Sequence, residues 1–175
     1  SASDCGWLYA PNVKCHELTI EEIQRLIAET ERTVRLCTEA GADAFEMHAY
    51  GGYLNDQFLT AAWNTRTDKY GGDVKGRATF LLEQIAAVRK CAGEKVPILV
   101  KFCPDHGVQY PGFRQLPEGI ELAKYLAENG VDALHVDAGC YEKWQLSMPA
   151  VFYQEAVMQL RSAKAVREAV SIPVL

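Results

Sequence analysis

A regular alternation of helix-like and strand-like segments constrains the fold of this sequence more than any other feature. Amphipathic helices are predicted at residues 19–41, 75–93, 117–130 and 151–170, and short apolar strands at 42–50, 96–104, 131–139 and 172–175. The strand at 96–104 is apolar on both faces, which is typical of a buried parallel sheet. The alternation therefore predicts an α/β fold whose parallel strands are connected by helical crossovers.

Local signals mark the ends of these helices. Thr19, followed three residues later by Glu22, predicts a capping box at the start of the first helix. Gly41 is placed to end that helix, and Pro117 suits the first turn of the third helix. The residues between 51 and 73 carry no strong periodicity, and we expect a long loop there.

An internal repeat narrows the choice of fold. The segments AGADAFEMHA (40–49) and NGVDALHVDA (129–138) share one pattern at an offset of 89 residues, the length of about two βα units. No Gly-x-Gly-x-x-Gly fingerprint follows a predicted strand, so a dinucleotide-binding sheet is disfavoured. We therefore expect a (β/α)8 barrel rather than a doubly wound sheet.

The length fits only part of such a barrel. A complete (β/α)8 barrel needs about 250 residues, whereas this chain has 175 and about four βα units. It also begins at a serine and stops within an apparent strand, SIPVL. We expect residues 1–175 to be a single partial domain, a barrel fragment with two unpaired sheet edges.

Composition excludes several functional classes. The net charge is −5 and the charges are interspersed, so neither nucleic acid nor an anionic membrane surface is an expected partner. No apolar run approaches the ~20 residues of a membrane-spanning helix. The six cysteines contain no Cys-x-x-Cys spacing, so no metal site is expected from this chain alone, and a reducing, cytoplasmic setting is predicted. The sequence does not determine the oligomeric state.

Polar residues at the carboxyl ends of the predicted strands are the candidate site. In (β/α)8 barrels these ends and the following loops form the active site. His48, Lys101 and Asp137 occupy such positions, and His48 and Asp137 are equivalent in the two repeat copies. His48 could instead be a satisfied core or rim group, Lys101 a lysine reaching the surface, and Asp137 a carboxylate bonded to loop amides.

Aromatic and charged residues surround these positions. Tyr50 and Tyr53 follow His48, and Tyr141 and Trp144 follow the third strand, where all four could simply be rim aromatics. The loop NTRTDKYGGDVKGR suggests a structural lock, with ion pairs among Arg66, Asp68 and Arg77 and a turn at Tyr70-Gly71-Gly72.

Two of these stretches also carry a family likeness. EMHAYGGYLNDQFL, followed by NTRTDKYGG, resembles the signature of the old yellow enzyme family, the NADH:flavin oxidoreductases. The stretches KFCPDHGV and LHVDAGCYEKW are similar to the branch that contains 2-enoate reductases and 2,4-dienoyl-CoA reductases. The resemblance covers residue 17 to the end. It implies an FMN-binding (β/α)8 barrel, of which this chain would form roughly the fourth to seventh strands.

The resemblance implies roles for three residues. Tyr53 matches the proton donor, and His48 the first of two groups that hydrogen-bond the substrate carbonyl or carboxylate. Lys101 matches a position beside the flavin N1 and C2 carbonyl that is often arginine. Lysine keeps the positive charge but lacks the planar guanidinium, which can donate two parallel hydrogen bonds. Gly51 departs from the family, because the second substrate-binding group is expected there. Tyr50 is the neighbouring candidate to replace that group.

The implied reaction is reduction of the C=C bond of an α,β-unsaturated carbonyl, carboxylate or acyl-CoA compound, with FMN as cofactor and NAD(P)H as reductant. The larger family members imply a 4Fe–4S cluster and FAD outside this segment. Two alternatives stay open. Lys101 could form a Schiff base in an aldolase-type barrel, or the isolated chain could be an inactive structural fragment.

Overall fold

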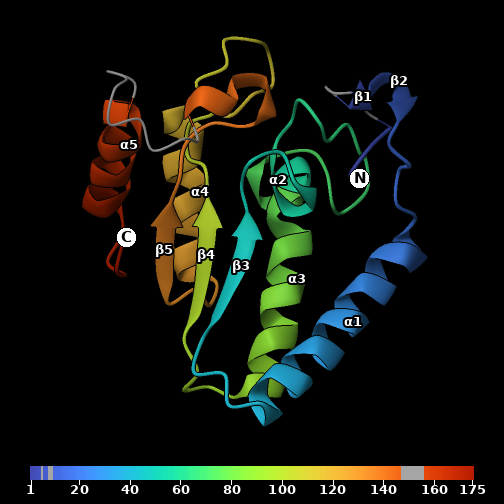
Figure 1. Cartoon of the computed structure of the whole chain (residues 1–175), viewed down its shortest axis with the longest axis vertical. Coiled ribbons are helices and arrows are strands. Elements are labelled where there is room, and N and C mark those ends of the chain that lie inside the picture. The colour runs from blue at the N-terminus through green and yellow to red at the C-terminus, as the bar shows by residue number, and fades with distance from the viewer. Residues whose placement is uncertain (5, 8–9, 147–155) are drawn as a thin grey trace.

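Three parallel strands form the sheet at the centre of the chain. The computed structural model describes residues 1–4, 6–7, 10–146 and 156–175 (Figure 1). Strands β3 (Phe45–Ala49), β4 (Ile98–Phe102) and β5 (Ala133–Val136) lie in the order β3-β4-β5, and both pairs are parallel. Val174 forms a further parallel bridge to Leu134, next to β5. The predicted order of parallel strands is therefore confirmed.

Helices cover one face of this sheet. Helix α3 (Val74–Ala92) packs on β3 and β4, α1 (Ile20–Glu39) packs on α3, and α4 (Leu116–Glu128) contacts both α3 and α5 (Ala156–Ala169). In Figure 1 α4 lies behind β4 and β5, and α3 lies between β3 and α1. The predicted capping box at Thr19 and Glu22 is present. Residues 151–155 of the last predicted helix lie outside the described residues.

Four short elements were not predicted. Helix α2 (Leu54–Leu59) interrupts the expected loop, the 3-10 helix η1 (Tyr141–Leu146) follows β5, and β1 (Gly6–Trp7) and β2 (Ala10–Lys14) form an antiparallel hairpin. The expectation of a continuous loop between 51 and 73 was therefore wrong. At six residues, α2 is too short to show helical periodicity in the sequence, and tertiary hydrogen bonds to its side chains hold it.

The two faces of the sheet differ in side-chain chemistry. Along β4, Ile98, Val100 and Phe102 are buried against the helices, in a core shared with Leu81, Leu122 and Leu134. The alternate residues of the strands face the other way and are partly or fully exposed. They include Glu46, His48, Lys101 and His135. The site candidates therefore lie on the face that the helices leave uncovered. None of the helices among the described residues is long and apolar enough to cross a membrane.

Candidate functional site

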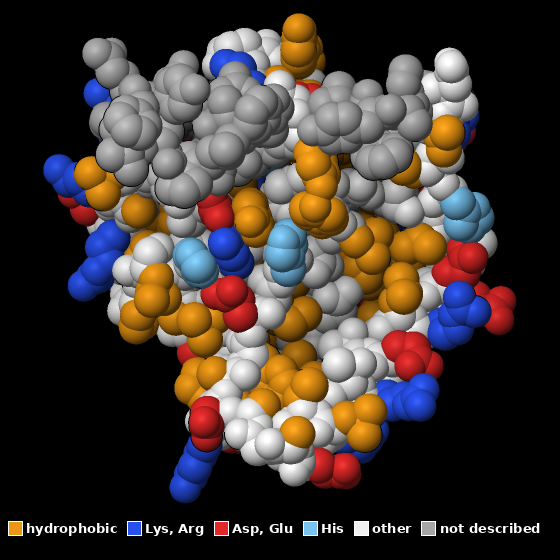
Figure 2. Space-filling view, in the orientation of Figure 1, with side chains coloured by type: hydrophobic (Ala, Val, Ile, Leu, Met, Phe, Trp, Pro, Cys, Tyr) orange, Lys and Arg blue, Asp and Glu red, His pale blue; other side chains and the backbone are white. Residues whose placement is uncertain are grey.

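Strand register brings the predicted strand-end residues together. His48 of β3 pairs with Lys101 of β4, and Lys101 pairs in turn with His135 of β5. Figure 2 shows histidine, basic and acidic side chains gathered near the centre of the face that the strands present. This row of polar side chains lies close to the carboxyl ends of the strands, where a barrel places its chemistry.

Lys101 is held at this face as a cation. Its Nζ lies 3.0 Å from Asp137 Oδ2 and 4.6 Å from the centre of the Tyr50 ring. Partial burial lowers the pKa of Lys101, but the hydrogen bond and negative charge of Asp137, together with Tyr50, outweigh burial and raise it above the ordinary value. The amine is therefore protonated at neutral pH, and Asp137 stabilises this charged form.

His48 and two tyrosines form an aromatic group beside this ion pair. The His48 ring stacks on Tyr50 at a centroid distance of 4.6 Å and an interplanar angle of 29°. Tyr53 meets His48 edge-on at 5.1 Å. The Tyr53 hydroxyl, in turn, hydrogen-bonds the hydroxyl of Tyr141 in η1, while 51% of the Tyr53 residue is exposed. The structure thus brings His48, Tyr53 and Lys101 together, and the side chain of Trp144 lies outside what is described.

The backbone conformation at position 51 explains why a glycine occurs there. Gly51 has φ +75°, a left-handed conformation that costs most side chains about 1–2 kcal/mol. A Cβ at this position would lie 3.4 Å from the Tyr53 ring, in contact with it. The positive φ, rather than a lack of space, is therefore what favours glycine at position 51.

A buried ionic network of Asp56, His106 and Arg114 is hydrogen-bonded to the turn that ends at Tyr53. Asp56 of α2 accepts a hydrogen bond from the backbone N–H of Gly52 at 2.9 Å. The same carboxylate lies 3.1 Å from Arg114 Nη2 and 3.2 Å from His106 Nε2, and all three of these side chains are fully buried. Arg114 also donates to the carbonyl oxygen of Cys103, just after β4. The network therefore connects the Tyr53 turn to the strand that carries Lys101.

The protonation states in this network follow from the geometry. His106 Nδ1 accepts the backbone N–H of Arg114 at 3.1 Å, so Nε2 carries the proton and donates to Asp56. Burial raises the pKa of Asp56, but His106, the Arg114 guanidinium and the Gly52 hydrogen bond outweigh burial and hold it at about 2. Asp56 is therefore an ionised carboxylate at neutral pH.

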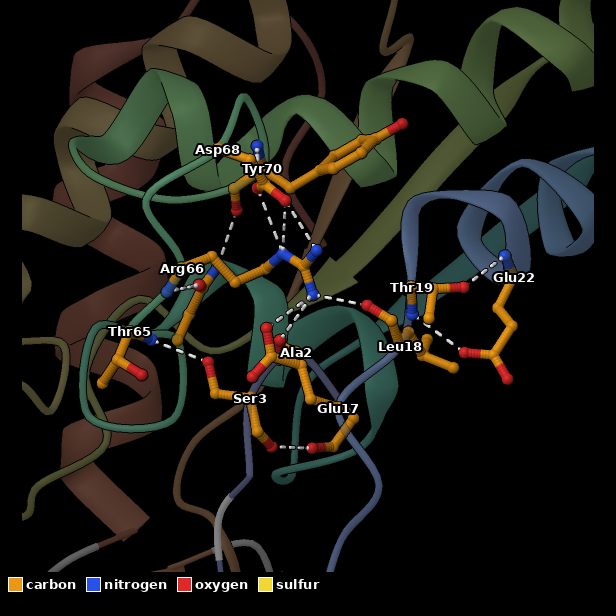
Figure 3. A network of polar contacts seen from close by, with 12 residues as sticks. Ala2, Ser3, Glu17, Leu18, Thr19, Glu22, Thr65, Arg66, Asp68 and Tyr70 are labelled. Carbon is orange, nitrogen blue, oxygen red and sulfur yellow. Dashed lines mark hydrogen bonds and ion pairs between the residues drawn. The ribbon is translucent and has the colours of Figure 1, made fainter.

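The predicted loop lock is confirmed in part. Arg66 binds both oxygens of Asp68, with Nη2 to Oδ2 at 2.6 Å, and also donates to the carbonyl oxygens of Ala2 and Leu18 (Figure 3). Arg77 instead forms its ion pair with Glu118 of α4. The lock therefore has two parts, one on the N-terminal segment and one on α4. No local sequence signal points to Glu118.

Gly71 is required in this loop by a close backbone approach. A Cβ added at Gly71 would lie 2.0 Å from the Arg66 carbonyl oxygen. The predicted role of the Tyr70-Gly71-Gly72 turn thus has a steric basis.

The sequence-based prediction missed two polar groups. Glu46 and His135 form a pair across β4, with Glu46 Oε1 2.8 Å from His135 Nδ1. Each precedes a predicted site residue by two positions, and strand periodicity could have placed both on the same face. The contacts of Asp56 with His106 and Arg114 had no such signal, because they join residues 50 and 58 positions apart.

The cysteines are placed as packing residues. Cys103 and Cys140 are buried, and burial raises the pKa of the Cys103 thiol well above its usual range and that of Cys140 to about 12. Both thiols are therefore protonated and weakly reactive at neutral pH. Cys37 and Cys91 are partly buried.

Comparisons with known proteins agree with this geometry. A model of the NADH:flavin oxidoreductase / NADH oxidase family matches residues 1–175. The chain is 33% identical over 181 aligned positions to the cinnamate reductase of Clostridium sporogenes, an alignment that covers 95% of the chain and 27% of that protein.

Solved structures of related enzymes share the fold. The chain superposes on histamine dehydrogenase from Rhizobium sp. 4-9 with a TM-score of 0.80 and 27% identity, covering 93% of the chain and 23% of that protein. It superposes on an old yellow enzyme homologue from Zymomonas mobilis with a TM-score of 0.67 and 25% identity. This superposition covers 99% of the chain and 56% of the homologue. The prediction of a partial (β/α)8 barrel is confirmed, and the chain spans about a quarter of the cinnamate reductase that it matches. The chain belongs to the NADH:flavin oxidoreductase / NADH oxidase family.

Proposed function

We propose that this chain is part of a flavoenzyme that uses NAD(P)H to reduce the C=C bond of an α,β-unsaturated carbonyl, carboxylate or acyl-CoA compound. The observation that carries the proposal is the convergence of His48, Tyr53 and Lys101 on one face, at the carboxyl ends of β3 and β4. The similarity to a cinnamate reductase supports an unsaturated substrate.

Each of the three side chains has a separate task in this proposal. His48 donates a hydrogen bond to the substrate oxygen on which negative charge develops, and one such donor is worth about 2.7–4 kcal/mol in the transition state. Tyr53 gives its phenolic proton to the α-carbon, since a phenol with a pKa near 10 is protonated at neutral pH. Its hydrogen bond to Tyr141 restricts the orientation of the hydroxyl that delivers this proton.

The residues at the uncovered face fit an FMN. An ammonium has three N–H donors, and Asp137 occupies one of those of Lys101, which is partly exposed at 22%. Lys101 would therefore contact an electron-rich edge of the flavin ring, as the family resemblance implies. When bound, FMN would supply the hydride that the reduction of a C=C bond requires.

The same lysine environment argues against the aldolase-type alternative. A Schiff base forms from the neutral amine, and catalytic lysines of that kind have a lowered pKa. The Asp137 carboxylate instead raises the pKa of Lys101. We therefore assign Lys101 to the cofactor rather than to covalent catalysis.

The remaining parts of the proposal concern the complete protein. We propose that residues 1–175 are a single partial domain of a longer chain, which we call the parent enzyme, because the cinnamate reductase that it matches is almost four times as long as the aligned part. Its other segments would supply the remaining FMN contacts and, as in the larger family members, a 4Fe–4S cluster and FAD. We propose a reducing, cytoplasmic setting, with which the free thiols of Cys37, Cys91, Cys103 and Cys140 are consistent.

Replacing Tyr53 by phenylalanine tests the proposed function. In the parent enzyme, Tyr53→Phe should slow reduction of an unsaturated substrate by about 10²–10⁴-fold, because it removes the general acid. Reduction of the flavin by NAD(P)H should stay nearly unchanged, because Tyr53 gives no proton in that step. Stopped-flow absorbance at the flavin band separates the two half-reactions. Tyr110→Phe is the matched control, since Tyr110 is exposed at 72% and lies outside the site. Two unaffected half-reactions in Tyr53→Phe would remove Tyr53 from the mechanism.

A further inference from the structure

Position 50 carries a phenol that the proposed reaction has not yet used. Tyr50 directly follows β3 and lies two residues after His48, so both side chains point to the uncovered face. Its ring stacks on the His48 ring with the two centroids 4.6 Å apart. The Lys101 Nζ lies over the same Tyr50 ring, 4.6 Å from its centroid. Tyr50 thus lies between the proposed substrate donor and the proposed flavin contact.

The neighbouring positions do not supply a second donor of this kind. An oxygen that gains charge in a transition state is usually stabilised by more than one preorganised donor, and His48 alone supplies one. Gly51 has no side chain, and the hydroxyl of Tyr53 is directed to that of Tyr141. The hydroxyl of Tyr50 is the polar group next to His48 that is left to contact the same oxygen.

The surroundings of Tyr50 suit this task. Stacking on His48 and contact with Lys101 restrict the ring, so little conformational freedom is lost when a ligand binds. The Lys101 ammonium lies 4.6 Å from the centre of the Tyr50 ring, and its attraction favours an oxygen that bears negative charge, although the Asp137 carboxylate offsets part of that charge. Tyr50 is also only partly buried. Its hydroxyl accepts a hydrogen bond from Lys101, which leaves the phenolic O–H as the donor for a ligand on the uncovered face.

We propose that Tyr50 is a substrate-binding residue whose hydroxyl donates, together with His48, to the carbonyl or carboxylate oxygen of the unsaturated substrate. The inference rests on the proposed function, because it concerns the same substrate oxygen. It assigns the recognition of that oxygen to adjacent side chains of one strand end, His48 and Tyr50, with Gly51 free to form the turn.

Tyr50→Phe in the FMN-loaded parent enzyme tests this inference. Phenylalanine keeps the ring, and with it the stacking on His48 and the contact of the ring with Lys101, but it removes the hydroxyl, which both donates to the substrate and accepts from Lys101. The wild-type enzyme is first given a panel of 2-enoates and enones that includes cinnamate. For a compound that it reduces, Tyr50→Phe should lower kcat/KM about 10- to 100-fold, the loss typical of one hydrogen bond to a charged oxygen. Tyr110→Phe should leave kcat/KM unchanged.

The half-reactions separate the possible outcomes. Unchanged flavin absorbance and an unchanged rate of flavin reduction by NAD(P)H, together with the loss in kcat/KM, would support a substrate contact. An equal loss in flavin reduction would overturn the inference, because Tyr50 would then act through Lys101 and the cofactor. A kcat/KM equal to that of the wild type would overturn it and leave the proposed function intact. Reduction of no compound in the panel by the wild type would overturn both.

Discussion

Removing the Arg114 guanidinium should destabilise the protein far more than the loss of an ordinary arginine. Arg114 is fully buried, and its Nη2 donates to Asp56 at 3.1 Å and to the Thr60 hydroxyl at 2.8 Å. Arg114→Ala leaves the buried Asp56 carboxylate without a counter-charge and the Cys103 carbonyl without its donor. Breaking a buried ion pair in this way typically costs about 3–5 kcal/mol. His106 and Gly52 still donate to Asp56, so we expect about 3 kcal/mol.

Urea unfolding of the parent enzyme measures this loss. The ring centroids of Trp63 and His106 are 5.5 Å apart, so Trp63 fluorescence reports on unfolding close to the Asp56–Arg114–His106 network. With a slope of about 2 kcal/mol per molar urea, a loss of about 3 kcal/mol lowers the midpoint by about 1.5 M. The matched control is Arg35→Ala, which removes a largely exposed ion pair to Glu31 and should cost at most about 0.5 kcal/mol.

The pH dependence gives a second measurement of the same network. The folded-state pKa of Asp56 is about 2, below its ordinary value of 3.8, so its contribution is present above pH 4 and is lost as the pH falls towards 2. The difference between these two pKa values corresponds to a contribution of about 2 kcal/mol to the free energy of unfolding. In Arg114→Ala the burial of Asp56 is less opposed, its pKa rises, and the deficit relative to the wild type should shrink in acid. Equal midpoints for Arg114→Ala and Arg35→Ala at pH 7 would refute the reasoning.

Three further predictions concern the turns and the site. Gly71→Ala should lower the free energy of unfolding by more than Gly41→Ala, because the new Cβ at position 71 would lie 2.0 Å from a backbone oxygen. Gly41 has open space around it, so alanine there costs only the backbone strain of its φ of +89°, about 1–2 kcal/mol. Urea midpoints compare the two variants, and equal values would contradict the steric argument. His48→Ala in the parent enzyme should weaken a phenolic ligand that stacks on the flavin by about tenfold or more, measured by flavin absorbance titration; unaltered affinity would place His48 outside the site. The isolated 175-residue chain should quench FMN fluorescence weakly or not at all, and tight binding would contradict the proposal that most flavin contacts lie elsewhere.

Local sequence signals were sufficient for the layout of the sheet. Period-two and period-3.6 patterns, the capping box at Thr19 and the internal repeat depend on neighbouring residues, and all describe structure that β3, β4, β5 and α1 contain. The position of His48 and Lys101 at strand ends could be predicted for the same reason. Strand register then makes them neighbours, which follows once the strands are parallel and adjacent.

Long-range contacts decided the rest. The direction of the Tyr50 side chain, the pairing of Lys101 with Asp137 and the partner of Arg77 each depend on which segments meet in space. The Asp56–Arg114 contact joins residues 58 positions apart, and no periodic pattern spans such a distance.

The sequence by itself therefore determined the α/β class, the alternation of its elements and the residues at the strand ends, because these depend on periodicities within one segment. Only the tertiary structure decided how the site is built: that Asp137 stabilises the charged form of Lys101, that a buried network under Gly52 supports the Tyr53 turn, and that Tyr50 faces His48. The physical reason is that charge pairing and burial are properties of groups brought together by folding, and their energies depend on distance in space rather than on position in the chain.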